Sequence, residues 1–174
     1  MTPTLIVFSG LPGSGKSTLA LGLAAHLNAA YLRLDTIEAA LLNAGLPSVG
    51  IEGYAVAYAL AADALRLGQT VVADCVNPLT VTREAWQAVA RNMSSRMLDL
   101  EVICSDRQEH RRRVETRQAD ESNWAGRWTP PTWETVTRHD YEPWASARTV
   151  IDTARGEQAE LLASVLALVQ NPAR

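Results

Sequence analysis

The segment GLPGSGKST, Gly10 to Thr18, combines three glycines with the only lysine among the 174 residues of the chain. It fits the pattern G-x-x-x-x-G-K-[ST] and lies between an apolar run and a helical pattern, the context in which this pattern forms a phosphate-binding loop. Its backbone N–H groups and the helix start would form an anion nest, and Lys16 is a compact point charge that fits inside it, unlike the wide arginine fork. The predicted nucleotide-binding residues are Gly10, Leu11, Pro12, Gly13, Ser14, Gly15, Lys16, Ser17 and Thr18.

Two aspartates follow strand-like runs, Asp35 after YLRL and Asp74 after VVA. Ligands of an open parallel sheet bind beyond the carboxyl ends of its strands, so both carboxylates are expected near the loop. Phosphoryl transfer needs Mg²⁺ beside the β- and γ-phosphates and a carboxylate that orients the attacking hydroxyl and accepts its proton. We predict that Ser17 and Asp74 hold Mg²⁺ and that Asp35 is the base. The alternative for each aspartate is a cap on the following helix.

Apolar runs alternate with helical patterns from end to end, which predicts one α/β domain over residues 1–174 with helices on both faces of a parallel sheet. Strands are expected at residues 4–8, 30–35, 70–74, 98–105 and 147–152. Helices are expected at residues 17–27, 36–44, 51–67, 80–92, 107–117, 132–141 and 156–169. Residues 118–131 contain a glycine and two prolines and are predicted to form an irregular flap.

The composition limits the class of partner. The net charge of −3 gives no general attraction for nucleic acid or an anionic membrane, and no apolar run approaches the roughly 20 residues of a membrane span. The start of the chain lacks the basic region of a signal peptide. Cys75 and Cys104 lie in apolar runs and are interpreted as small core residues in a reducing compartment. We therefore expect a cytoplasmic enzyme.

Other nucleotide-binding classes fit less well. A guanine-specific GTPase normally carries an N-K-x-D motif, which the chain cannot supply because it has no second lysine. A motor ATPase usually follows the strand-end aspartate with a glutamate that activates water, whereas Cys75 follows Asp74 here. A small phosphotransferase is the best remaining class.

The sequence resembles the small P-loop kinases that are grouped with the kinase domain of polynucleotide kinase, chloramphenicol phosphotransferase and zeta-type toxins. The motifs that carry the resemblance cover nearly the whole chain; they are GLPGSGKST, YLRLDTIEAAL, VVADCVNPLTVTREAW, HRRRVETR and PTWETVTRHDYEPW. The resemblance implies a three-layer, adenylate-kinase-like α/β fold with a five-stranded parallel sheet in the order 2-3-1-4-5. It also implies ATP·Mg²⁺ as donor and a hydroxyl as acceptor, and it supports Asp35 as the base.

The arginine-rich segment HRRRVETR is expected to begin a lid of approximately residues 107–131. Arg113 and Arg117 are four residues apart and share one helix face. The resemblance implies that such a pair closes over ATP, where guanidinium groups stabilise the charge on the transferring phosphoryl oxygens. Arg155, in the loop after the last expected strand, is predicted to contact adenine.

The acceptor side departs from the family pattern. Relatives that hold a phosphorylated acceptor often show D-x-x-R after the second strand, but DTIE puts Glu38 in the arginine's position. Glu38 favours a polyol, amine or cationic acceptor, or else belongs to a solvated helix face. The family layout turns Asn77 and Arg83 toward the acceptor, although a turn residue and an exposed helix charge are the alternatives. Trp124 and Trp128 are predicted to stack on a ligand.

Two other functions stay open at this point. A polynucleotide 5′-hydroxyl kinase is favoured by the arginines and tryptophans of the lid, while the net charge and Glu38 count against it. An ATP-binding regulator of the toxin-like kind would bind the nucleotide to control a protein partner. The expected partners of the favoured function are ATP and a small hydroxyl acceptor. The sequence indicates neither the identity of that acceptor nor the oligomeric state.

Overall fold

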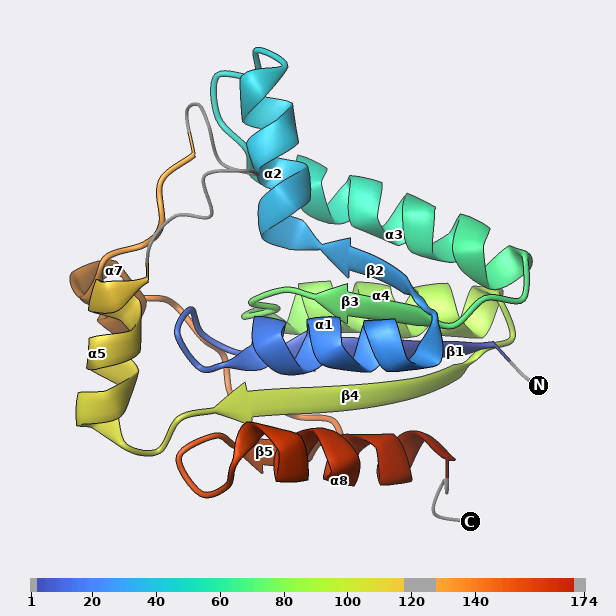
Figure 1. The fold of residues 1–174 in the computed structure, drawn as a ribbon. Helices are drawn as coiled ribbons and strands as arrows, with labels where there is room; N and C mark the ends of the chain where they lie inside the picture. The colour runs from blue at the N-terminus through green and yellow to red at the C-terminus, as the bar shows by residue number, and fades with distance from the viewer. Residues whose placement is uncertain (1–2, 118–127, 171–174) are drawn as a thin grey trace.

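The computed structural model of the chain describes residues 3–117 and 128–170. Five strands form one sheet, in which each strand is parallel to its neighbours and the order is β2-β3-β1-β4-β5 (Figure 1). The strands are β1 (Thr4–Ser9), β2 (Ala30–Arg33), β3 (Val71–Asp74), β4 (Arg96–Ile103) and β5 (Thr149–Asp152). This topology confirms the fold class and strand order that the resemblance implies.

Helices cover both faces of the sheet. Figure 1 shows α1 and α8 on one face, with α3 and α4 on the other and α5 at the carboxyl edge of the strands. The helices of the described residues are α1 (Lys16–Leu27), α2 (Leu34–Asn43), α3 (Glu52–Arg66), α4 (Thr80–Asn92), α5 (Arg107–Thr116), α7 (Trp133–Thr137) and α8 (Gln158–Gln170). Within the described ranges, no helix has both the length and the apolar character needed to cross a membrane.

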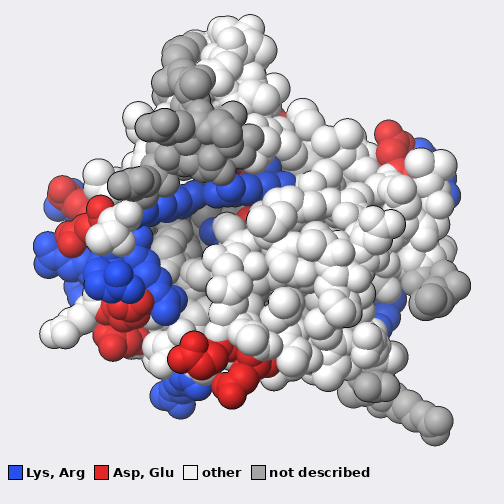
Figure 2. All heavy atoms as spheres, in the orientation of Figure 1, with Lys and Arg blue, Asp and Glu red and all other residues white. Residues whose placement is uncertain are grey.

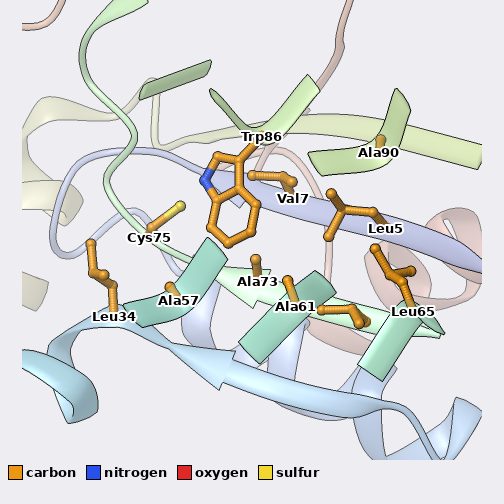
Figure 3. Packing of buried hydrophobic residues seen from close by; sticks show 11 residues of the cluster. Leu5, Val7, Leu34, Ala57, Ala61, Leu65, Ala73, Cys75, Trp86 and Ala90 are labelled. Atoms are coloured by element: carbon orange, nitrogen blue, oxygen red, sulfur yellow. The ribbon is translucent and has the colours of Figure 1, made fainter. Parts of the chain in front are cut away.

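Two apolar clusters fill the space between the sheet and its helices. The central strand β1 is buried along its whole length, so its alternate side chains supply both clusters. Leu5 and Val7 belong to the cluster under α3 and α4, where Trp86 is completely buried (Figure 3). Cys75 lies in the same cluster. It is a free, buried thiol, as is Cys104, so both cysteines are the small buried residues that the sequence predicts.

The join between β2 and α2 corrects one expectation. The sequence predicts a strand as far as Asp35, but β2 ends at Arg33 and α2 begins at Leu34 without a loop. Arg33 has extended backbone angles and serves as the N-terminal boundary of α2, which places Asp35 in the first helical turn. The carboxylate still lies at the carboxyl edge of the sheet, because the helix starts there. A carboxylate is also favourable in the first turn of a helix.

Candidate active site

Glycines shape the loop between β1 and α1. Gly13 and Gly15 have positive φ angles of 82° and 92°, and Gly15 is the residue before the first turn of α1. A Cβ atom at Gly10 would lie 2.2 Å from the carbonyl oxygen of Val102 in β4. The loop therefore needs glycine both for its backbone conformation and for its close packing on the sheet.

Lys16 and Asp74 lie together beneath this loop. Both are almost completely buried, and Lys16 Nζ is 3.9 Å from Asp74 Oδ1. Asp74 Oδ2 accepts a hydrogen bond of 2.8 Å from the Tyr31 hydroxyl. Asp74 Oδ1 is buried with no hydrogen-bond partner among the described residues. Burial and the Asp74 carboxylate both raise the pKa of Tyr31, so this phenol stays a neutral donor.

These residues fit a magnesium ion that is shared with a nucleotide. Mg²⁺ prefers oxygen ligands and is usually held by one or two protein oxygens together with phosphates and water. Asp74 offers a buried carboxylate oxygen, and Ser17 lines the small hollow at the loop. The described residues contain no group of three or more His, Cys, Asp or Glu side chains that could hold a metal by themselves.

Arg33 is a site residue that sequence reasoning missed. Its guanidinium lies between the two aspartates, with Nη2 3.7 Å from Asp35 Oδ2 and Nε 3.9 Å from Asp74 Oδ2. Arg33 also lines the hollow at the loop. Arg33 is the last residue of β2, and ligands of a parallel sheet bind at the carboxyl ends of its strands. This position at a strand end is the feature of the sequence that could have identified it.

Asp35 contacts the predicted lid. Arg117 Nη2 donates a hydrogen bond of 3.1 Å to Asp35 Oδ2, which joins the end of α5 to the first turn of α2. Both side chains are about four-fifths buried. The structure therefore brings the predicted base and one of the two predicted phosphate-binding arginines into direct contact.

Arg113 joins α5 to the segment after β5. It donates from Nη1 to Thr153 Oγ1 at 2.7 Å and from Nε to Glu109 Oε1 at 2.8 Å. Thr153 Oγ1 in turn donates to the carbonyl oxygen of Ser14 at 2.7 Å. Hydrogen bonds from Arg112 and Arg113 lower the pKa of Glu109 to about 2. Thr153, which sequence reasoning did not select, connects the loop to the predicted lid helix.

His110 adds a second contact between α5 and the loop. Its Nε2 lies 2.8 Å from the carbonyl oxygen of Pro12, and a carbonyl only accepts, so the imidazole is the donor. The ring packs edge-on against Trp133 at a centroid distance of 5.2 Å. A Cβ atom at Gly13 would approach Val114 to 2.5 Å. His110, which sequence reasoning did not select, therefore helps to hold α5 on the loop.

Two adjoining hollows open at the loop. The smaller, about 330 Å³, is lined by loop residues together with Arg33, Arg113 and Arg117. The larger, about 710 Å³, shares Gly15, Thr18 and Arg113 with it and extends between α5 and the start of α8. Figure 2 shows Lys and Arg side chains gathered around a hollowed part of this face. The basic hollow can hold phosphates, and the larger hollow has room for a nucleoside.

Arg155 has a different position from the one the adenine prediction requires. Its side chain is 79% exposed and Nε pairs with Asp152 Oδ2 at 3.0 Å. The neighbouring Ala154 and Gly156 line the larger hollow, but Arg155 is not among its lining residues. The loop after β5 therefore lies at the larger hollow, as expected. The Arg155 side chain, however, points to Asp152 and not into that hollow.

Arg83 also differs from the sequence expectation. It is 3% exposed and donates to the backbone carbonyls of Asn77, Pro78, Glu142 and Pro143 at 2.9 to 3.1 Å. Its guanidinium carbon lies 4.2 Å from the centroid of the Trp144 ring. Arg83 is thus not an exposed helix charge, and its guanidinium makes four hydrogen bonds to backbone carbonyls of the chain itself. It clamps the segment after β3 to the segment before β5.

Asn77 is buried beside the loop and does not face an open pocket. Its φ angle is 51°, its side-chain nitrogen donates to Ser9 Oγ at 2.9 Å, and its backbone N–H donates to the Tyr54 hydroxyl at 2.9 Å. Ser9 is the last residue of β1, so Asn77 fixes the start of the loop relative to β3. Where the sequence predicts contacts to an acceptor, the Asn77 amide nitrogen and the Arg83 guanidinium bond to the chain itself, and Asn77 Oδ1 is buried with no hydrogen-bond partner among the described residues.

Glu38 lies one turn after Asp35 on α2. Burial and the charge of Asp35 raise its pKa to about 7. Its Cγ atom packs on Gly53 of α3, where a Cβ would come within 2.8 Å. Of the two predicted stacking residues, Trp128 lies with its ring centroid 5.7 Å from the guanidinium carbon of Arg117. Trp124 falls outside the described residues.

Comparisons with known proteins agree with this fold. A family model described as an AAA domain matches residues 5–128. The Mycobacterium tuberculosis APS kinase in complex with AMPPNP and APS has 21% identity and a TM-score of 0.71, over 98% of this chain and 99% of that one. A gluconokinase from Sinorhizobium meliloti has 18% identity and a TM-score of 0.63, over 95% and 91% of the two chains. Kti12 from Chaetomium thermophilum in complex with ADP-AlF3 has 24% identity and a TM-score of 0.64, over 93% and 97%. No curated protein sequence matches the chain significantly.

The sheet order, the glycine loop and the buried Lys16–Asp74 pair together define a P-loop nucleotide-binding protein with the fold of small P-loop kinases. The chain belongs to the family that the AAA domain model describes, since the match covers well over half of its residues. This assignment confirms the resemblance on which the sequence predictions rest.

Proposed function

We propose that the protein is a kinase that transfers the γ-phosphoryl group of ATP to a hydroxyl of a small molecule. The observation that carries this proposal is the 3.1 Å contact between Arg117 and Asp35. Arg117 also lines the hollow at the phosphate loop, so the carboxylate stands at the border of the space where phosphates would bind.

The roles follow from these positions. Lys16 and the loop amides bind the β- and γ-phosphates, and Arg113 and Arg117 stabilise negative charge on the transferring oxygens. Asp35 accepts the proton of the acceptor hydroxyl as its oxygen bonds to the γ-phosphorus and the bond to the ADP oxygen breaks. Mg²⁺, when held by Ser17 and Asp74, supplies further positive charge at the phosphates.

The surroundings of Asp35 favour an acceptor that carries an amine or several hydroxyls. Glu38 is a second carboxyl group one turn away, and none of the ion pairs found among the described residues includes it. Beside Glu38, a negatively charged acceptor group would be repelled, whereas an ammonium or hydroxyl group would be stabilised. Asp35 itself is already paired with Arg33 and Arg117. Proteins of similar fold include an APS kinase and a gluconokinase, which are named for small-molecule acceptors.

The electrostatics of α5 support a small acceptor over a polynucleotide. Arg111 pairs with Glu115 and Arg112 pairs with Glu109, so two of the exposed arginines of this helix are paired on their own surface. Binding to a phosphate backbone depends on unpaired cations that release counterions. Together with the net charge of −3, these pairs disfavour nucleic acid as the acceptor.

The Asp35→Asn variant tests the proposal. Wild-type protein, Asp35→Asn and the matched control Asp140→Asn, a change at an exposed aspartate, are incubated with ATP·Mg²⁺ and a metabolite extract. Mass spectrometry should find a compound that gains one phosphoryl group with the wild type and the control. Loss of the base should slow its formation by about 10²- to 10⁴-fold in Asp35→Asn with little change in ATP affinity.

Two outcomes would contradict the proposal. Phosphorylation by Asp35→Asn at the wild-type rate would remove Asp35 as the base. ATP binding without any phosphorylated product would instead support an ATP-dependent regulator, and a complex with a protein partner in a pull-down would identify that class.

A further inference from the structure

The Thr153 hydroxyl lies between the phosphate loop and α5. Its Oγ1 donates to the carbonyl oxygen of Ser14 at 2.7 Å and accepts from Arg113 Nη1 at 2.7 Å. A hydroxyl has one proton, so the longer contact of 3.2 Å with the Ile103 carbonyl oxygen is the weaker alternative for donation. With its proton on the Ser14 carbonyl, the hydroxyl turns its lone pairs toward the guanidinium. The direction of this acceptor is therefore set by the conformation of the loop.

The guanidinium of Arg113 is held from two different segments of the chain. Its Nε donates to Glu109 Oε1 at 2.8 Å, and its Nη2 donates to the Thr153 carbonyl oxygen at 3.3 Å, in addition to the bond from Nη1 to the Thr153 hydroxyl. Glu109 lies on α5 and moves with that helix, whereas Thr153 ties the guanidinium to the segment after β5. An arginine that is already held loses less freedom on binding a phosphate than one that must first be ordered.

The position of Thr153 is itself fixed by the sheet and by the loop. Its backbone N–H donates to the carbonyl oxygen of Ile103 at 2.9 Å, which continues the pairing of β5 with β4. A Cβ atom at Gly15 would lie 3.1 Å from Thr153 Cγ2, so the threonine methyl group packs directly on the loop. Arg113 lines both hollows, and Thr153 lines the larger one. Thr153 therefore connects the sheet, the loop and α5 where the two hollows meet.

We propose that Thr153 is a positioning residue of phosphoryl transfer, whose hydroxyl aligns the Arg113 guanidinium with the phosphate loop before the transferring group reaches it. The inference rests on the proposed function, because Arg113 acts there on the transferring oxygens. Donors that are in place beforehand stabilise a transition state best, since they need no reordering while the charge moves. Thr153 touches none of the reacting atoms and acts through Arg113.

The affinity for ADP·Mg²⁺ with and without aluminium fluoride tests the inference, and no acceptor is needed. Aluminium fluoride beside ADP stands in for the transferring phosphoryl group, so the increase in affinity on its addition measures how strongly the site stabilises that group. Isothermal titration calorimetry measures both affinities. Thr153→Val keeps the shape and removes the hydroxyl; it should reduce the increase about tenfold, with little change in the affinity for ADP·Mg²⁺ alone. Thr153→Ser keeps the hydroxyl and should retain most of the increase.

A double-mutant cycle separates the positioning of Arg113 from a purely structural role of Thr153. Arg113→Ala should reduce the aluminium fluoride increase by about 10²-fold, and Thr153→Val in that background should cause little further loss, because the group that the hydroxyl aligns is gone. Thr137→Val is the matched control and should keep the increase, since Thr137 is exposed on α7 and its hydroxyl donates to the Glu134 carbonyl oxygen at 3.0 Å. Melting temperatures show whether each variant folds, and Thr153→Ala repeats the test if Thr153→Val does not fold.

Three results would overturn the inference. The first is an aluminium fluoride increase in Thr153→Val as large as in the wild type. The second is an equal loss from Thr153→Val with and without Arg113, which would mean that the hydroxyl acts on the loop and not through the guanidinium. The third is a wild type whose affinity for ADP·Mg²⁺ does not rise with aluminium fluoride. The proposed function fails on a different result, the absence of a phosphorylated product, so the two failures are distinguishable.

Discussion

At the scale of single residues, Glu38 is a carboxyl group whose charge changes near neutral pH. Burial and Asp35 raise its pKa from 4.5 to about 7 in the folded protein. The folded state therefore binds a proton more tightly than the unfolded chain does, and stability decreases as the pH rises from about 4.5 to about 7. Above pH 7 the full cost of the buried charge is present.

Replacement of Glu38 by glutamine should remove this cost. At pH 8 the Glu38→Gln variant should have a free energy of unfolding about 1 kcal/mol higher than the wild type. At pH 4.5 the difference should nearly vanish, because the wild-type carboxyl is protonated in the folded state. Urea unfolding at the two pH values checks this prediction, and a difference that does not depend on pH would contradict it.

The site positions that the sequence predicted best are those set by a local pattern. Lys16 and the loop glycines follow from one contiguous motif, because the backbone conformation and the charge are both encoded within eight residues. Arg33 and Thr153 were missed because their roles depend on partners far along the chain, Asp74 and Ser14 respectively. Only the meeting of strand ends at one edge of the sheet brings these groups together.

At the scale of elements, the docking of α5 on the phosphate loop depends on Gly13. Its φ angle is 82°, and a Cβ there would lie 2.5 Å from Val114 Cγ2 and 3.2 Å from the His110 ring. A side chain at this position must therefore displace α5 as well as strain the backbone. Displacement would also move Arg113, which lines both hollows.

The Gly13→Ala variant should lose about 2 kcal/mol of unfolding free energy and bind ATP at least about tenfold more weakly. Gly68→Ala is the matched control, since its φ angle of 79° gives the same backbone strain while no atom lies within 4 Å of the added Cβ. Chemical denaturation and isothermal titration calorimetry measure the two effects. Equal losses in the two variants would show that backbone strain, and not the contact with α5, is the cause.

Element positions were predicted better than element ends. The alternation of strands and helices and the strand order follow from apolar periodicity and the resemblance, and both agree with the structure. The ends differ where tertiary contacts override local pattern, as at Asp35, which continues a strand-like run but belongs to α2. Arg83 shows the same limit, because its partners at Glu142 and Pro143 lie about sixty residues away.

At the scale of the whole molecule, the site is assembled from segments that contact one another through charged groups. Arg117 pairs with Asp35 across α5 and α2, Arg113 joins α5 to the segment after β5, and Lys16 pairs with Asp74 at the end of β3. A nucleotide that neutralised these three cations at once would connect the sheet to α5. Binding should therefore stabilise the entire fold against unfolding, in proportion to its affinity for the folded state.

Lys16 variants test this coupling. At about 100 times its dissociation constant, ATP·Mg²⁺ should stabilise the wild type by about 2.7 kcal/mol and raise the melting temperature by several degrees. Lys16→Ala should lose nearly all of this increase, because the phosphates lose their buried cation. Lys16→Arg should lose most of it as well, since Lys16 is 5% exposed and the planar fork does not fit the space beneath the loop. If ATP·Mg²⁺ stabilised Lys16→Arg as much as the wild type, a positive charge alone would suffice at this position. The shape of the lysine side chain would then not be the reason for the single lysine of this chain.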